Sequence, residues 1–432
     1  EGVYVKATAV SATLGAWVRQ GQPVLSNFGG SPDANSAAAA TAMAALLGKV
    51  IIGPGTHLFT TATISVPVLF MDGASVTVNS PNTLTLASRI ESSRQHIFRG
   101  TGLVALQFTG GSDPEGEDCR NTHVSWWGVF PSGDVQTAAI QRALNAYSTQ
   151  GREGIIDFDN GSYRIDGKLT IPRGVHLRGC GTRRTIFDLV GQGYTAMEAA
   201  GDAVKITGIQ FEQPAGMESS RTGILIDLLD WNGCVVDDVW LWGTHIGIKS
   251  SGNDCRITRI SGRYDYGSAP GANSALVWLA GGARIMLDDL SVSGQLYGPE
   301  SIVLIGKGNA ATMSMIDINN VMTTEQSIPV NIVADTANIS MVSVNGVIHA
   351  GSTGETIDAL VKLVTSGSAA ISAVNINGLV ANAIASALVA IIQGSSASTY
   401  YVTIGSGVIY GSTGSGVSLT RTNGTLSYVT IG

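Results

Sequence analysis

Apolar and polar residues alternate in short runs along the chain, and one such run recurs at a regular interval after residue 200. In segment 342–347 the sequence Val-Ser-Val-Asn-Gly-Val places apolar residues at alternate positions, then a two-residue polar turn, then another apolar residue. Period-two alternation is typical of a half-buried β-strand, and Asn, Asp and Gly tolerate the backbone angles of a tight bend. Eight segments align on this turn: 204–211, 234–241, 255–260, 285–292, 316–321, 342–347, 374–379 and 402–408.

The spacing of these turns predicts a solenoid. The second turn position is occupied by Gly208, Asp238, Arg259, Asp289, Asn320, Gly346, Gly378 and Gly407, the last after one extra residue. Seven steps lead from residue 208 to residue 407, which is about 28 residues per step. Further apolar runs follow after loops of variable length, for example at 224–226, 246–248 and 302–305. Three strands per coil result. Because parallel crossover connections are right-handed, the predicted fold class is all-β, a right-handed parallel β-helix.

A solenoid exposes unpaired strand edges at its ends and needs caps. Residues 134–147 place Ile140, Ala143, Leu144 and Tyr147 on one helical face, which predicts an N-terminal capping helix before the first coils. A similar order of helix and strands occurs about 100 residues earlier, with an Ala-rich helix at 37–47 and apolar runs at 50–52 and 64–67. We therefore expect a small N-terminal strand-rich unit. Alternatively, these residues form the first coils of the same helix.

Composition and charge argue against several classes of function. The chain of 432 residues contains 55 Gly, 44 % hydrophobic and only 13 % charged residues, which is typical of a folded, turn-rich protein. A net charge of −7 disfavours nucleic acid and anionic membranes as partners, no apolar run is long enough to span a bilayer, and the first residues are not a signal peptide. The four cysteines form no CxxC pair, and the pattern at 100–105 is interpreted as a turn rather than a dinucleotide site. The sequence thus predicts no metal and no cofactor.

One stretch resembles a known family. Ser125-Trp-Trp-Gly-Val129, Gly133-Asp134 and Ala138-Ala-Ile-Gln141, followed by Ile171-Pro-Arg-Gly-Val-His-Leu177 and Gly179-Cys-Gly181, are similar to the entry segment and first coils of pectate-lyase-like bacteriophage tailspikes. The resemblance covers about 125–432 and is interrupted at Phe130-Pro-Ser132. It implies a homotrimer in the virion tail that degrades a bacterial surface polysaccharide such as capsule, exopolysaccharide or O-antigen. That family has no common catalytic motif.

With this resemblance the chain is expected to have three parts. Residues 1–20 are a linker or the remnant of a region that attaches the protein to the virion. Residues 21–120 are the small N-terminal domain. Residues 121–432 are the capping helix and the β-helix, of which 326–432 mainly form the trimer.

The alignment of the repeats shows which residues share a position along the coils, and we use it to choose candidate site residues. Carboxylates at the turns, Asp237, Asp238, Asp288 and Asp289, resemble acid–base pairs, but Asn319, Asn320 and Asn345 share the same positions, which favours a structural ladder. After the bend, Trp240 and Trp242 point outward. They form either a platform for sugar rings or a surface covered by a loop or another subunit.

We predict a glycoside hydrolase, because carboxylates one or two coils apart on one face match the spacing of catalytic pairs. The catalytic candidates are Glu212, Asp265, Glu300, Asp227 and Glu218, and the substrate-binding candidates are Trp240, Trp242, Arg263, Tyr266, His245 and Arg221. The first alternative is a lyase, in which His245, Tyr266 or Lys249 removes a proton beside a uronate whose carboxylate Arg263 or Arg221 neutralises. The second is a trimeric fibre that binds glycan without cutting it.

The C-terminal quarter carries few charges. Residues 326–432 include only Asp335, Glu355, Asp358, Lys362 and Arg421 as charged residues, and no Trp. Their outward column after the bend is predicted as Ile348, Val380 and Ile409. A surface so poor in charge is expected to be buried between subunits.

Overall fold

The computed structural model describes residues 4–6, 17–19, 23–107, 121–148, 154–191, 193–212, 223–243, 245–264, 273–294, 299–308, 311–324, 327–350, 356–381, 384–394, 397–409, 415–421 and 425–432. The chain divides into two compact units: Glu1–Pro131 with Ala138–Phe158, and Ser132–Thr137 with Asp159–Gly432. We call them unit 1 and unit 2.

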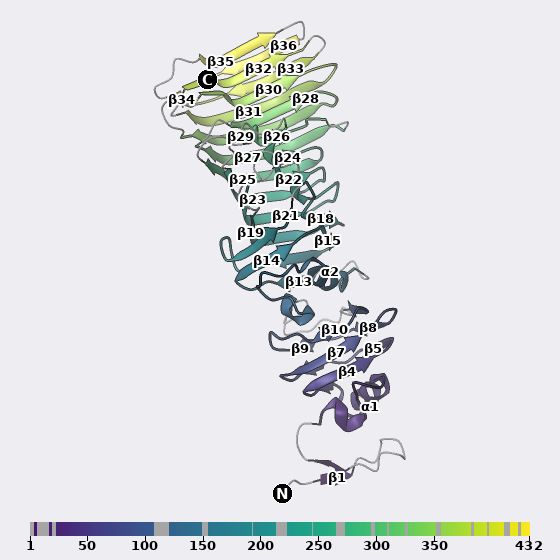
Figure 1. Ribbon diagram of the computed structural model, residues 1–432. Helices are drawn as coiled ribbons and strands as arrows, with labels where there is room; N and C mark the ends of the chain where they lie inside the picture. The colour runs from purple at the N-terminus through teal and green to yellow at the C-terminus, as the bar shows by residue number, and fades with distance from the viewer. Residues whose placement is uncertain are drawn as a thin grey trace. The chain divides into compact units, whose positions relative to one another are not determined.

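Unit 1 is built around a small three-sided parallel solenoid (Figure 1). Its three parallel sheets have the orders β3-β6-β9, β4-β7-β10 and β5-β8-β11. The elements are β1 (Tyr4–Lys6), β2 (Trp17–Arg19), η1 (Leu25–Phe28), α1 (Ala37–Leu47), β3 (Val50–Ile52), β4 (Gly55–Phe59), β5 (Ala62–Ile64), β6 (Val68–Phe70), β7 (Ala74–Val78), β8 (Thr83–Leu86), β9 (Ile90–Glu91), β10 (Phe98–Arg99), β11 (Leu103–Leu106), β12 (Asn121–His123), η2 (Val124–Trp127), α2 (Thr137–Asn145) and β13 (Gly154–Asp157).

The two helix-and-strand segments that the sequence indicated are both present. The short helices η1 and η2 each end at a glycine in the left-handed region, Gly29 and Gly128, and each is followed by an α-helix and then by strands. Helix α1 buries Ala39, Ala40 and Met43, whereas α2 buries Ile140, Ala143 and Leu144. Small residues and a narrow apolar face are what a helix needs to lie close against strands.

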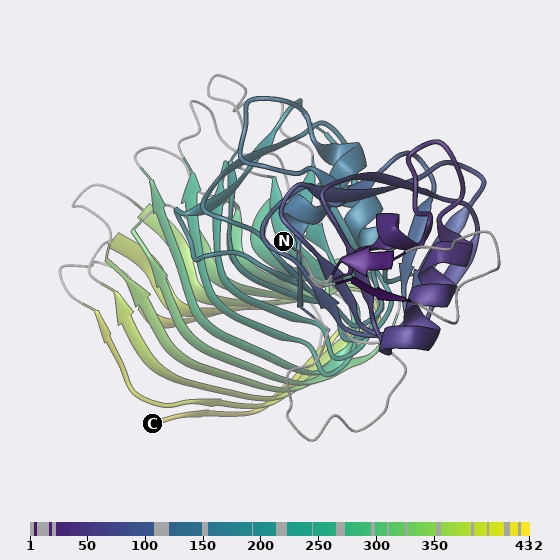
Figure 2. The ribbon, with the colours of Figure 1, turned by 90° about the horizontal axis from the view of Figure 1, so that it is seen from below.

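Unit 2 is a parallel β-solenoid whose strands stack coil on coil (Figure 2). One sheet runs β16-β19-β21-β23-β25-β27-β29-β31-β33-β36, with β14, β17 and β34 paired alongside, and we call it the bent sheet. The second sheet runs β15-β18-β20-β22-β24-β26-β28-β30-β32-β35.

The strands of unit 2 are β14 (Gly161–Ile165), β15 (Leu169–Pro172), β16 (Val175–Arg178), β17 (Thr185–Leu189), β18 (Met197–Ala200), β19 (Lys205–Glu212), β20 (Ile224–Asp227), β21 (Val235–Trp242), β22 (Ile246–Ser250), β23 (Arg256–Tyr264), β24 (Ala275–Leu279), β25 (Ala283–Gly294), β26 (Ser301–Ile305), β27 (Met313–Thr323), β28 (Ile328–Ala334), β29 (Ile339–His349), β30 (Thr356–Thr365), β31 (Ala370–Ala381), β32 (Ile384–Gln393), β33 (Ser398–Ile404), β34 (Gly407–Ile409), β35 (Ser415–Arg421) and β36 (Thr425–Ile431).

Each strand of the bent sheet from β19 to β31 bends where the sequence places the turn. Gly208, Asp238, Arg259, Asp289, Asn320, Gly346 and Gly378 have φ between +52° and +68°. This left-handed residue turns the strand, and the alternation then resumes on the other side. Inward residues stack directly upon one another. Val204, Cys234, Cys255, Ile285, Ile316, Val342, Val374 and Val402 are each at most 1 % exposed.

The eighth turn differs from our prediction. Ile404 pairs with Ile376 and Gly407 with Leu379, so both strands have the same number of residues between these pairs. There is no extra residue, Ser406 holds the second turn position, and Val408 rather than Ile409 pairs with Val380. A Cβ at Gly407 would lie 2.8 Å from Leu388 Cδ1, so the Leu388 side chain fills the inward space there.

The predicted fold class, an all-β parallel β-helix with about 28 residues per coil, is therefore confirmed. The predicted division into three parts stays a prediction. Among the described residues, no helix is long and apolar enough to cross a membrane.

Candidate functional site

The outer face of the bent sheet beyond the bend carries two columns of polar and aromatic side chains. In the first column, Gln210 pairs with Trp240, Trp240 with Ser261, Ser261 with Ser291, and Ser291 with Met322. In the second column, Arg164 pairs with Asp188, Asp188 with Glu212, Trp242 with Arg263, and Arg263 with Ser293. Strands β19 and β21 pair up to Phe211 and Leu241, so Glu212 and Trp242 continue this second column.

Two carboxylates stand side by side in the second column. Asp188 and Glu212 are directly paired residues of β17 and β19, and neighbouring strands lie about 4.8 Å apart. Burial of Glu212 and the nearby Asp188 carboxylate both raise the pKa of the Glu212 carboxyl. Asp188 in turn faces Arg164, whose Nε lies 3.8 Å from Asp188 Oδ2. The pair therefore holds one carboxyl that retains its proton more readily and one that has a cation beside it.

The two predicted indoles are half-buried and lie against each other, with ring centroids 5.9 Å apart. An arginine guanidinium lies over each ring: that of Arg183 is 5.1 Å from the Trp240 centroid, and that of Arg263 is 5.5 Å from the Trp242 centroid. Trp240 and Trp242 point outward as the sequence indicated. The two rings are tilted by 46° to each other, and each also lies against an arginine, a contact that sequence spacing did not predict.

A groove of about 550 Å³ runs along the first column. Trp240, Ser261, Ser291 and Met322 lie in it, and bend residues of the same strands line it as well. The complete lining is Thr182, Arg183, Asp238, Trp240, Arg259, Ser261, Gly262, Asp289, Ser291, Val292, Ser293, Met322 and Thr324. Its length over several coils, its hydroxyl groups and its aromatic ring are suited to an extended polar chain such as a glycan.

The remaining predicted residues lie elsewhere. Asp227 is on the second sheet, between Glu198 and Lys249, and is only 6 % exposed. Burial is the main cause that raises the pKa of Asp227. Lys249 packs over Trp278, with Nζ 5.3 Å from the ring centroid. Thus Asp227 and Glu212 belong to different sheets, and the structure does not bring them together.

Glu300 and His245 lie where the chain enters the second sheet. The backbone N–H of Asn273 donates to Glu300 Oε2 (2.5 Å), and the Glu300 backbone N–H donates to Ser274 Oγ (2.8 Å). Burial lowers the pKa of His245, and the negative charge of Glu300 opposes this effect. His245 is therefore a neutral imidazole at pH 7. Asp265, Glu218, Tyr266 and Arg221 lie outside the described residues.

Of the four turn carboxylates, Asp237 and Asp288 take part in a ladder, as the sequence favoured, whereas Asp238 and Asp289 line the groove. Asn345 Nδ2 donates to Asn319 Oδ1 (3.1 Å), and Asn320 Nδ2 donates to Asp288 Oδ1 (3.0 Å). Asp237 accepts a hydrogen bond from Thr258 Oγ1 (2.6 Å) and forms an ion pair with Arg259. These side chains satisfy one another from coil to coil.

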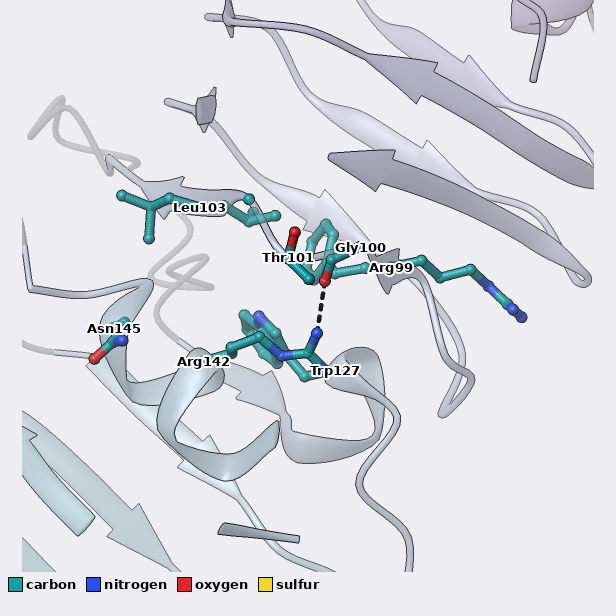
Figure 3. A pocket seen from close by; sticks show the side chains of 10 residues that line it. Arg99, Gly100, Thr101, Leu103, Trp127, Arg142 and Asn145 are labelled. Atoms are coloured by element: carbon teal, nitrogen blue, oxygen red, sulfur yellow. Dashed lines mark hydrogen bonds between the residues drawn. The ribbon is translucent and has the colours of Figure 1, made fainter. Parts of the chain in front are cut away.

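A smaller pocket of about 160 Å³ lies in unit 1 (Figure 3). Arg142 of α2 donates Nη1–H to the Gly100 carbonyl (2.6 Å), while the Arg99 side chain extends away from it (Figure 3). A Cβ at Gly100 would lie 2.2 Å from the Val78 carbonyl oxygen, so glycine is required by close packing. The chain turns here and enters strand β11 instead of a helix, which agrees with the interpretation of residues 100–105 as a turn.

Sequence reasoning missed Asp188, Arg164 and Arg183. The alignment of repeats began at Val204, and in the preceding coil the bend is replaced by a longer turn, residues 179–184, between β16 and β17. If the alignment of repeats had been extended one coil towards the N-terminus, to the alternating segment Thr185-Ile-Phe-Asp-Leu189, it would have placed Asp188 beside Glu212. No repeat pattern would have located Arg183, because it belongs to the inserted turn.

No protein-family model matches the chain, and no curated protein matches it. Solved structures do match. ORF18 of Geobacillus virus E2 is 14 % identical over 72 % of this chain, with a TM-score of 0.50, and this chain spans 62 % of its length. The A-module of the mannuronan C-5 epimerase AlgE6 of Azotobacter vinelandii is 13 % identical, covers 72 % of this chain and 99 % of its own, and has a TM-score of 0.42. The Dettilon tailspike protein is 11 % identical over 72 % of this chain and 68 % of its own, with a TM-score of 0.38. At these identities the similarity to the virus protein shows the fold, a parallel β-helix.

Proposed function

We propose that this protein is a depolymerase that cleaves a bacterial surface polysaccharide by glycoside hydrolysis. The observation that carries the proposal is the Asp188–Glu212 pair, which lies on the same outer sheet face as Trp240 of the groove, although neither carboxylate lines the groove. Retaining glycosidases hold two carboxyl groups about 5 to 5.5 Å apart, and the side chains of directly paired residues, whose strands lie about 4.8 Å apart, can reach that separation.

The two carboxyl groups differ in the way this chemistry needs. Glu212, whose pKa is raised, is the general acid and protonates the glycosidic oxygen as the bond to the leaving sugar breaks. Asp188, beside Arg164, attacks the anomeric carbon as a carboxylate and forms a glycosyl ester. Ionised Glu212 then takes a proton from the water that hydrolyses the ester. Because the first step needs protonated Glu212, activity should fall as pH rises through the pKa of Glu212.

The test is cleavage of purified capsule, exopolysaccharide and O-antigen preparations, followed by light scattering of polymer length and by assay of new reducing ends. Asp188→Asn and Glu212→Gln should each lower the rate by about 100-fold or more. Asp317→Asn, an exposed carboxylate on the same sheet, is the matched control and should keep full activity. Full activity in both test variants would move the site elsewhere. Amide variants of Asp227, Asp265, Glu300 and Glu218 then examine the other candidates.

The product separates hydrolysis from its alternatives. A lyase leaves an unsaturated sugar that absorbs in the ultraviolet, with neutral His245 as a suitable base. Such a product would contradict hydrolysis. Persistent polymer length despite binding would instead favour a non-catalytic fibre. The homotrimer, attachment to a virion through the N-terminal region and location in a phage tail stay predictions that rest on the family resemblance.

A further inference from the structure

One arginine in the groove has no acidic partner among the described residues. The guanidinium of Arg183 lies over the Trp240 ring, and that ring contact is its single described side-chain interaction. Two other arginines of the same unit are neutralised: Arg259 pairs with Asp237, and Arg284 donates to both oxygens of Asp254 at 2.5 and 2.6 Å. Arg183 is thus a cation that the described fold leaves available.

The turn that carries Arg183 is hydrogen-bonded to the next coil. Arg183 lies in the turn that replaces the bend between β16 and β17, and the Gly181 N–H donates to the Gly208 carbonyl (3.1 Å) of the next coil. Arg183 itself has φ of +66°, a conformation that long side chains rarely adopt. Arg259 and Arg284 share this left-handed conformation, so the position of the cation over an indole at the groove, and not the backbone angle, distinguishes Arg183.

No described residue accepts a hydrogen bond from the Arg183 guanidinium, so its N–H groups remain available. These N–H groups lie in the plane of the guanidinium and point outward from it. In this planar arrangement, the N–H groups match the two oxygens of a carboxylate. The indole limits the motion of the arginine without neutralising its charge, so little side-chain entropy is lost when an anion binds.

We propose that Arg183, held over Trp240, binds the carboxylate of an acidic sugar in the substrate. Asp238 and Asp289 also line the groove and would repel an acidic sugar placed against them. The acidic residue of the glycan is therefore assigned to the Arg183 end. This inference rests on the proposed glycan substrate, but it concerns recognition and does not depend on the cleavage mechanism.

The test compares binding of sodium glucuronate with that of glucuronamide, which has nearly the same shape but no charge. Saturation-transfer NMR on the full chain should detect glucuronate at least about tenfold more strongly than glucuronamide, because a charge-assisted pair is lost with the amide. Arg183→Met keeps an unbranched chain over the indole and removes the charge, so it should abolish this preference. Arg184→Met, in the same exposed turn, is the matched control and should leave it unchanged.

Equal binding of both probes by the wild type, or an undiminished preference in Arg183→Met, would overturn the assignment. Glu212→Gln should bind glucuronate as the wild type does. Loss of cleavage together with retained binding therefore separates a failure of the hydrolysis proposal from a failure of this one. A circular dichroism spectrum of each variant shows whether the solenoid is intact.

Discussion

Burial raises the pKa of both Glu212 and Asp227, but the two carboxyl groups have different neighbours. Glu212 lies on the outer face next to a second carboxylate, whereas Asp227 lies on the second sheet among Glu198, Lys249 and Lys168. Asp227 Oδ1 accepts a hydrogen bond from the Leu229 backbone N–H (3.0 Å), and this bond and Lys249 partly offset the effect of burial on its pKa. We therefore interpret Asp227 as a structural carboxylate whose ionised form is destabilised by burial.

Asp227→Asn should stabilise the protein at pH 7. The pKa of Asp227 in the folded state lies above the unfolded value, so its ionisation lowers stability as pH rises from the unfolded pKa through the folded pKa. Asparagine keeps an acceptor for the Leu229 N–H and removes the charge. Thermal unfolding should show a higher Tm than the wild type at pH 7 and no gain at pH 3. Asp317→Asn, which is exposed, should show neither change. A lower Tm of Asp227→Asn at pH 7 would contradict this explanation.

Single residues of the site were only partly predictable. Period-two alternation was sufficient to place Glu212, Trp240, Trp242 and Arg263 on one outer face, because register decides which side of a strand a residue occupies. It could not place Arg183, whose contact with Trp240 depends on a turn inserted between two strands. Asp227, another candidate, lies on a different sheet from Glu212, because the chain passes to the second sheet between them.

The bent strand is the repeated element, and its left-handed bend residue sets its shape. Asn and Asp accept this conformation more readily than other non-glycine residues, because their short polar side chains bond locally. Asn320 has φ of +52° and donates from Nδ2 to Asp288 Oδ1. A Cβ at Gly346 in the next coil would approach Asn320 Oδ1 to 3.0 Å, so the two positions also constrain each other.

Asn320→Val should destabilise the protein by about 1 to 2 kcal/mol relative to Asn320→Gly, because a branched residue is strained in the left-handed region. Both variants lose the hydrogen bond to Asp288, so the difference between them isolates the backbone conformation. Denaturant unfolding measures it. Thr403→Val, at an exposed outward position of the same sheet, should be nearly neutral. Equal stability of the two Asn320 variants would show that the bend does not require this conformation.

The repeated bend is what made the fold predictable at this level. Six of the eight turn positions follow from residue type alone, since Gly, Asn or Asp occupies them, and Arg259 follows from the apolar residues on either side of it. The eighth was misaligned because Gly405 and Gly407 are equally suited to a turn by composition. Only packing decides between registers there: the inward space at Gly407 is filled by Leu388.

At the scale of the whole molecule, the C-terminal coils expose apolar side chains in rows. After the bend, Met322 pairs with Ile348, Ile348 with Val380, and Val380 with Val408. Ile348 is 40 % and Val408 46 % exposed, and no charged residue stands in this row. We expect another subunit to cover this aliphatic row.

Val380→Asp should separate the subunits of the predicted homotrimer. Val380 lies in the middle of the exposed row. In a homotrimer the substitution would bury an unpaired carboxylate once in each of the three subunits, and each buried charge would cost several kcal/mol. Asn375→Asp introduces the same charge into the same strand at an exposed outward position before the bend and should leave the assembly intact. Light scattering of the wild type should give three times the chain mass of 44.6 kDa, and Val380→Asp should shift it towards one. A monodisperse wild-type monomer would reject the interface. An intact trimer of Val380→Asp would place the contact on another face.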